Sequence, residues 1–137
     1  MIRYLLDTNV VSEVRKPRPH GAVVSWLSSL YPGQICLSAV TLGELQAAIE
    51  ITRLQDAEKA QSLTEWLDKI SESHEILPMD GRCFREWALL VHGRSEAIFQ
   101  DAMIAATARV HALSVATRHE RDFKSFNIPV VNPFHSF

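Results

Sequence analysis

The sequence predicts an α/β domain in which about five short strands form a central parallel sheet with helices on both faces. Short apolar runs of strand length alternate with segments whose apolar residues recur at helical spacing. The turns between them are marked by proline and glycine, as in Pro17-Arg18-Pro19 and Pro32-Gly33. Strands that alternate with helices favour parallel pairing, because each helix returns the chain across the sheet.

The predicted strands are short apolar runs of the kind found in sheets that are buried on both faces. They cover residues 2–6, 35–37, Glu75 to Leu77, Ser114 to Thr117 and Pro129 to Val131. The clearest helix spans residues 97–112, where Phe99, Met103 and Val110 lie on one face of an alanine-rich segment. Other helices are predicted from Asp7 to about Arg15, over 21–30, 42–54 and 56–72, and after a cap at Asp80.

Composition and charge narrow the class of protein. The 137 residues suit one domain, 1–137, and 47% are hydrophobic, enough for a core. The net charge of -2 argues mildly against a protein that holds nucleic acid by electrostatics alone, although a nuclease with an acidic site fits it.

No apolar stretch is long enough to span a membrane, and the N-terminal run is too short for a signal peptide. A cytoplasmic protein is therefore expected, with Cys36 and Cys83 as buried, reduced thiols rather than the less favoured disulfide.

Asp7 directly follows the first predicted strand. The carboxyl ends of parallel strands are where α/β sheets bind ligands, so this position favours chemistry. Asp7 is equally well placed to cap the helix that follows. Taken alone, the residue does not separate the two roles.

Glu44 lies soon after the second predicted strand, in Thr41-Leu42-Gly43-Glu44. This segment fits the capping box, in which the acid reaches back to the first amide of a helix. The pattern alone therefore favours a cap over a functional carboxylate.

Two further acids give weak signals on their own. Asp101 lies near the start of the long helix, where an acid complements the helix dipole. Asp122 follows the fourth strand and suits a solvated turn. Taken together, however, Asp7, Glu44 and Asp101 are brought to one edge of the sheet by the predicted fold. Clustered carboxylates repel one another unless a hard divalent cation neutralises them, which predicts an Mg²⁺ site.

The same residues carry a resemblance to the PIN-domain family, particularly to the VapC-type toxins and the similar FitB proteins. The matching segments are LLDTNVVSEVRK at 5–16, LSAVTLGEL at 37–45, DAMIAATARVHAL at 101–113, VATRHERDF at 115–123 and VVNPF at 130–134. They span nearly the whole chain in the family's order. The resemblance implies a PIN fold and an endoribonuclease that depends on Mg²⁺ or Mn²⁺.

The resemblance also implies partners and site residues. It implies a toxin held inactive by a cognate antitoxin of VapB or FitA type, a homodimer, and an RNA substrate, for which transfer RNA is favoured although no residue selects it. The resemblance assigns metal binding to Asp7 and Asp101 first. It then assigns metal binding to Glu44, because the family has a site acid at the matching position.

One position departs from the pattern that this resemblance supplies. Many relatives have Asp or Asn where this chain has His119, so Asp122 is a candidate for the fourth acid. His119 is interpreted either as a contact to RNA or as an exposed bystander. Asn9 and Thr117 are expected to support the site, and Arg118 and Arg121 are candidates for phosphate contact, with solvated charge the equal alternative.

Two other classes of protein compete with the nuclease. A phosphatase that forms an aspartyl phosphate would favour D-x-D after the first strand, and Asn9 stands where its second acid would be. A non-catalytic interaction module would have no need of a repelling acidic cluster. Both alternatives are therefore less favoured than a nuclease.

Overall fold

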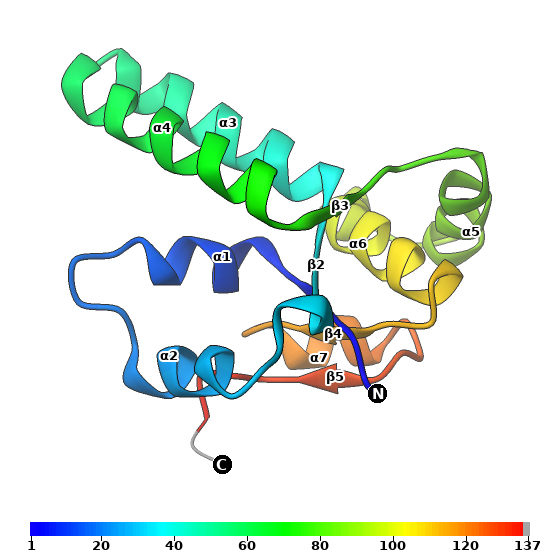
Figure 1. Cartoon of the computed structure of the whole chain (residues 1–137). Helices are drawn as coiled ribbons and strands as arrows, with labels where there is room; N and C mark the ends of the chain where they lie inside the picture. Colours follow the sequence, from blue (N-terminus) through cyan, green and yellow to red (C-terminus); the bar gives the residue numbers. More distant parts are fainter. Residues whose placement is uncertain (136–137) are drawn as a thin grey trace.

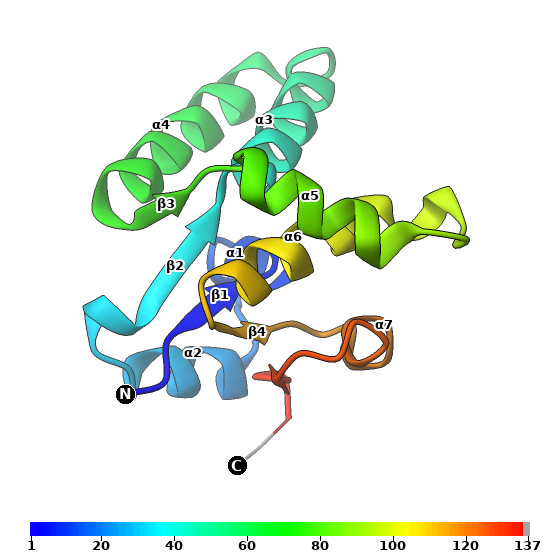
Figure 2. The same ribbon diagram turned by 90° about the vertical axis from the view of Figure 1, so that its right-hand side faces the viewer.

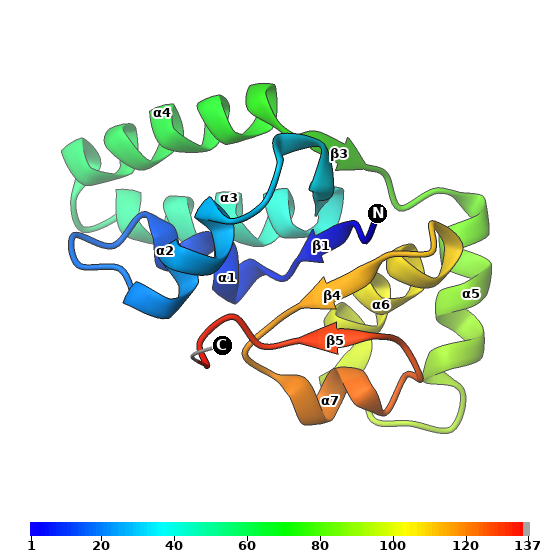
Figure 3. The same cartoon turned by 60° about the horizontal axis from the view of Figure 1, so that its bottom comes forward.

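The computed structural model describes residues 1–135 and contains a parallel sheet of five short strands (Figure 1). The strands are β1 (Tyr4–Leu6), β2 (Ile35–Ser38), β3 (Glu75–Leu77), β4 (Ser114–Ala116) and β5 (Val130–Val131). Their order is β3-β2-β1-β4-β5, and every neighbouring pair is parallel. Figure 3 shows β1, β4 and β5 side by side and running in one direction. The predicted parallel α/β architecture is confirmed.

Helices pack on both faces of the sheet. They are α1 (Thr8–Val14), α2 (Gly21–Ser28), α3 (Ala39–Arg53), α4 (Ala57–Ser73), α5 (Gly81–Val91), α6 (Phe99–Val110) and α7 (Glu120–Lys124). Short 3₁₀ helices cover Pro32–Gln34 and Glu96–Ile98. None of the helices among the described residues combines the length and the apolar character needed to cross a membrane.

The hydrophobic core has two parts, one on each face of the sheet. Leu6 packs in one part with residues of α1, α2, α3 and α4. Leu5 packs in the other part with residues of α6 and α7, beside partly buried residues of α5. Figure 2 shows α5 and α6 lying together on this second side. Successive residues of a strand point to opposite faces, so neighbouring leucines of β1 serve both cores.

The structure differs from the sequence prediction at the start of α3. The helix begins at Ala39 rather than at residue 42, because the Ser38 hydroxyl at the end of β2 caps it by accepting from the Val40 amide. Thr41 is buried inside the helix and is not a cap. The capping-box interpretation of Glu44 is therefore wrong, and its carboxylate is not engaged at the helix start.

Other local predictions have mixed outcomes. Asp80 caps α5 as predicted, by accepting from the Cys83 amide at 3.0 Å. Cys36 and Cys83 are both buried free thiols, as predicted. The sequence prediction missed α7, because a helix of five residues is too short to display a helical period.

Candidate active site

Asp7 lies at the carboxyl end of β1, in the middle of the sheet, and its side chain is almost fully buried. It is also the N-cap of α1, and its Oδ1 accepts a hydrogen bond from the Thr8 amide at 2.8 Å. The structure thus shows the predicted cap, and the cap uses only one of the two carboxylate oxygens. The other oxygen, Oδ2, faces the neighbouring strand.

Thr117 follows β4, the strand that pairs with β1, and is fully buried. Its hydroxyl donates to Asp7 Oδ2 at 2.7 Å. Asn9 Nδ2 donates to the same oxygen at 3.1 Å. Burial raises the pKa of Asp7, while the hydrogen bonds from Thr117, Thr8 and Asn9 and the nearby charge of His119 lower it in part. The carboxylate is therefore held in one orientation at some electrostatic cost.

Hydrogen bonds hold the segment after β4, residues 117–119, in place beside Asp7 and Asn9. The His119 amide donates to Thr117 Oγ1 at 2.9 Å, and the Arg118 amide donates to Asn9 Oδ1 at 3.2 Å. Residues 117–119 are thus positioned by Asp7 and Asn9, although they lie at the other end of the chain.

Asp101 lies in the first turn of α6 and is half-buried. Its pKa is raised to about 6, first by burial and then by the charge of Asp7, with a smaller contribution from Asp122. The charge of His119 acts in the opposite direction. A carboxylate oxygen of Asp7, one of Asp101 and a ring nitrogen of His119 all lie within 4.8 Å of one another.

Glu44 projects from α3 and is half-buried. Burial raises its pKa, and the charges of Asp7 and Asp101 raise it further, while the nearby Thr8 hydroxyl lowers it. The acid therefore belongs to the same electrostatic cluster. It lies outside the set of mutually close metal-donor atoms found among residues 1–135.

The remaining predicted site residues lie around this cluster. Asp122 is exposed on α7, close enough to Asp101 for its charge to raise the pKa of that acid. Arg118 is exposed, and its guanidinium lies 3.8 Å from the centre of the Phe134 ring, a cation–π arrangement. Arg121 is exposed on α7, the short helix that also carries Asp122.

His119 is the residue whose place in the cluster the sequence prediction missed. Its sequence context allowed either an RNA contact or a bystander, and the structure places its ring beside Asp7 and Asp101. One available signal was its position two residues after Thr117, in the segment that follows β4, the strand paired with β1.

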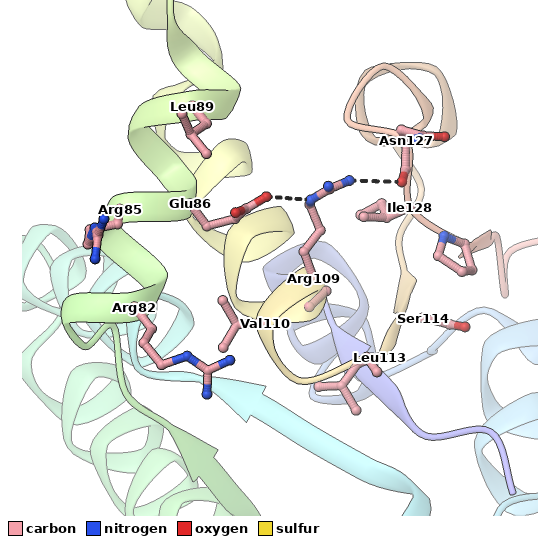
Figure 4. Close-up of a pocket in the computed structure, with 13 residues that line it drawn as sticks. Arg82, Arg85, Glu86, Leu89, Arg109, Val110, Leu113, Ser114, Asn127 and Ile128 are labelled. Carbon is pink, nitrogen blue, oxygen red and sulfur yellow. Dashed lines mark hydrogen bonds and ion pairs between the residues drawn. The ribbon is translucent and has the colours of Figure 1, made fainter.

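A cavity of about 720 Å³ lies away from the acidic cluster (Figure 4). It is lined at the beginning of β4 and just before β5, whereas Asp7 follows the end of β1. Arg109 crosses it, pairs with Glu86 of α5 at 2.6 Å and donates to the carbonyl of Asn127 at 3.2 Å. These contacts join α5, α6 and the segment before β5. The size of a cavity therefore does not locate the acidic cluster in this fold.

Comparison with known proteins places this chain in a family. The chain matches the PIN domain over residues 4–128. Toxin FitB from Neisseria gonorrhoeae is 37% identical over 96% of this chain and 98% of its own length. VapC ribonuclease Y4jK from Sinorhizobium fredii is 31% identical over 95% and 96%. The crystal structure of FitAcB from Neisseria gonorrhoeae superposes with a TM-score of 0.86 at 38% identity, covering 96% of this chain and 99% of the matched chain. The chain belongs to the PIN-domain family.

Proposed function

We propose that this chain is a metal-dependent endoribonuclease and the toxin of a type II toxin–antitoxin pair. The observation that carries the proposal is the cluster of Asp7, Asp101 and Glu44, all with raised pKa values. No lysine or arginine within residues 1–135 forms an ion pair with any of the three. Unpaired acids that oppose one another are typical of a site completed by a cation.

The family supports the reaction class. One relative that covers nearly the whole chain is named a VapC ribonuclease, and another is named a toxin. We infer that this chain cleaves RNA, with transfer RNA as the first substrate to test, and that a cognate antitoxin of FitA or VapB type binds it. One domain over residues 1–137, a homodimer and a cytoplasmic location stay predictions.

The donor set fits a divalent cation. Asp7 and Asp101 would hold Mg²⁺ or Mn²⁺ directly, with Glu44 and the more distant Asp122 as further candidate ligands. When bound, the cation would lower the pKa of a coordinated water and offset charge on the phosphodiester. Thr117 and Asn9 would keep Asp7 Oδ2 in place for this role, because both donate to that oxygen. These residue roles are all part of the proposal.

The proposal predicts that RNA cleavage depends on an added divalent cation. The full chain, purified without antitoxin and treated with EDTA, is expected to leave labelled transfer RNA intact and to cleave it once Mg²⁺ or Mn²⁺ is restored. Asp68→Asn, at an exposed position on α4, should behave like the wild type. Cleavage that persists in EDTA would reject the mechanism. A folded protein that cleaves no RNA with either ion would instead be the non-catalytic interaction module.

Asp122→Ala is expected to reduce kcat/KM for RNA by roughly tenfold, a size typical of residues that support a metal site from outside. The residue acts on Asp101 through its charge from an exposed position, so its loss should be partial. The measurement is single-turnover cleavage at several metal concentrations, beside Asp68→Asn. A wild-type rate at every concentration would place Asp122 outside the site.

A further inference from the structure

We propose that His119 is itself a metal ligand, binding through a ring nitrogen beside Asp7 and Asp101, and that this nitrogen makes the site prefer Mn²⁺ to Mg²⁺. The inference rests on the proposed metal site and adds to it both a ligand and an ion preference. The donor atoms of the three residues lie within 4.8 Å of one another. An ion bound at about 2.1 Å separates opposite ligands by about 4.2 Å, so small side-chain rotations suffice to close the set around it.

The backbone of His119 is held in place by the same network that orients Asp7. Its amide donates to Thr117 Oγ1, and that hydroxyl donates to Asp7 Oδ2. The preceding amide, from Arg118, donates to Asn9, which also holds Asp7. The histidine and the buried acid are therefore positioned together, which favours a ligand over an independent surface residue.

The ring of His119 is available for coordination. The side chain is exposed, and within residues 1–135 its hydrogen bond to the network comes from the backbone amide and not from the ring. A ring that is already bonded to a carboxylate or a carbonyl would have one nitrogen committed. A metal binds the unprotonated imidazole, which carries no charge of its own to offset the two carboxylates beside it, so a cation between the three side chains would be a partner common to all of them.

A nitrogen donor changes which ion fits best. Mg²⁺ is hard, prefers oxygen ligands and gives up its waters reluctantly, so it gains little from an imidazole. Transition ions such as Mn²⁺ accept mixed sets of nitrogen and oxygen. A set of two carboxylates and one imidazole should therefore give a larger ratio of Mn²⁺ affinity to Mg²⁺ affinity than a set of three carboxylates.

The test measures metal binding on the full chain without RNA. Mn²⁺ binding is followed by electron paramagnetic resonance, in direct titration and in competition with Mg²⁺, and spin-echo modulation reports nitrogen bound to Mn²⁺. The variants are His119→Asn, which lacks the imidazole, and His119→Asp, which supplies an oxygen ligand. The matched control is His111→Asn, at an exposed histidine that ends α6. Melting temperatures without metal check that all four proteins are folded.

We expect nitrogen modulation in the wild type and in His111→Asn, and its loss in both His119 variants. His119→Asn should bind Mn²⁺ at least about tenfold more weakly. His119→Asp should retain Mg²⁺ binding, with the ratio of Mn²⁺ to Mg²⁺ affinity reduced about tenfold. Wild-type protein that binds Mn²⁺ without nitrogen modulation, or unchanged Mn²⁺ affinity in His119→Asn, would overturn the inference. Metal-dependent cleavage could then still support the proposed function, whereas nitrogen-bound Mn²⁺ in a protein that cleaves no RNA would contradict the function and leave the ligand assignment standing.

Discussion

Asp101→Asn is expected to abolish RNA cleavage and, in the metal-free protein, to raise the melting temperature. The carboxylate is half-buried beside Asp7, and its pKa is about 6 instead of the ordinary 3.8. An amide of the same shape removes both the metal ligand and the charge that the folded state disfavours. Cleavage should fall by about 10³-fold or more, because metal ligation contributes several kcal/mol and each tenfold change in rate corresponds to about 1.4 kcal/mol.

The stability effect has a definite dependence on pH. Below pH 3.8 the acid is neutral in both the folded and the unfolded chain, so it costs nothing relative to Asn. As the pH rises from 3.8 to about 6, the unfolded chain loses this proton before the folded protein does, and stability is lost. Above that range the charged Asp101 lowers the free energy of unfolding by a constant amount, about 1–2 kcal/mol after allowance for solvent screening. The variant should therefore melt roughly 3–6 °C above the wild type at neutral pH, and close to it at pH 4.

Calorimetry with and without Mn²⁺ provides the check. The cation stabilises only the protein that binds it, so the order of the two melting temperatures should reverse as Mn²⁺ is added. Asp68→Asn, an exposed change of the same chemistry, should follow the wild type throughout. An Asp101→Asn protein that still cleaves RNA, or that gains as much stability from Mn²⁺ as the wild type, would refute the assignment of this acid.

Much of the fold could be predicted because the strands are apolar runs separated by long amphipathic helices. The order of the strands could not, since β3 and β4 are both short runs of similar character and nothing in them specifies on which side of β1 each one lies. The start of α3 was misplaced for a local reason. Ser38 ends β2 and caps α3 at once, so no separate loop marks the boundary. Helix boundaries depend on such single hydrogen bonds, which a periodic pattern does not contain.

The acidic cluster was predictable in part, because one of its members follows a strand that the sequence predicts. Asp7 follows a recognisable strand, and its place at a strand end was enough to suggest a site. Glu44 was harder, because its assignment depended on where α3 begins, and the misplaced start turned it into a cap. For His119 the decisive facts are the amide bond to Thr117 and the adjacency of β4 to β1. Both are properties of the tertiary structure, so the sequence offered only the position of His119 two residues after Thr117 and left its role undecided.

Thr117→Val is expected to damage both the site and the fold, in contrast to Asp101→Asn. The substitution keeps the shape of the side chain and removes a fully buried hydroxyl. That hydroxyl donates to Asp7 and accepts from the His119 amide, so a buried carboxylate and a backbone amide each lose a partner. The expected cost is about 1–3 kcal/mol of stability, because a buried polar group is left without a hydrogen bond.

The effect on cleavage should be a loss of about 10–100-fold, typical of a residue that orients a metal ligand without touching the metal. The hydrogen bond from Thr117 is the largest of the influences that lower the pKa of Asp7. Without it the pKa of Asp7 rises further, and the acid limb of the pH–rate profile should move to higher pH, because the cation competes with the proton for that carboxylate.

Two variants separate positioning from simple destabilisation. Thr117→Ser keeps the hydroxyl and should restore both the rate and the acid limb. Thr107→Val removes another fully buried hydroxyl, bonded to the Met103 carbonyl within α6, and should lower the melting temperature while leaving the rate and pH profile of the folded protein unchanged. If Thr117→Val and Thr107→Val lose stability alike and both keep the wild-type pH profile, Thr117 only supports the core. If the acid limb moves in Thr117→Val alone, its hydroxyl sets the charge state of Asp7, and the link between β4 and β1 is part of the active site.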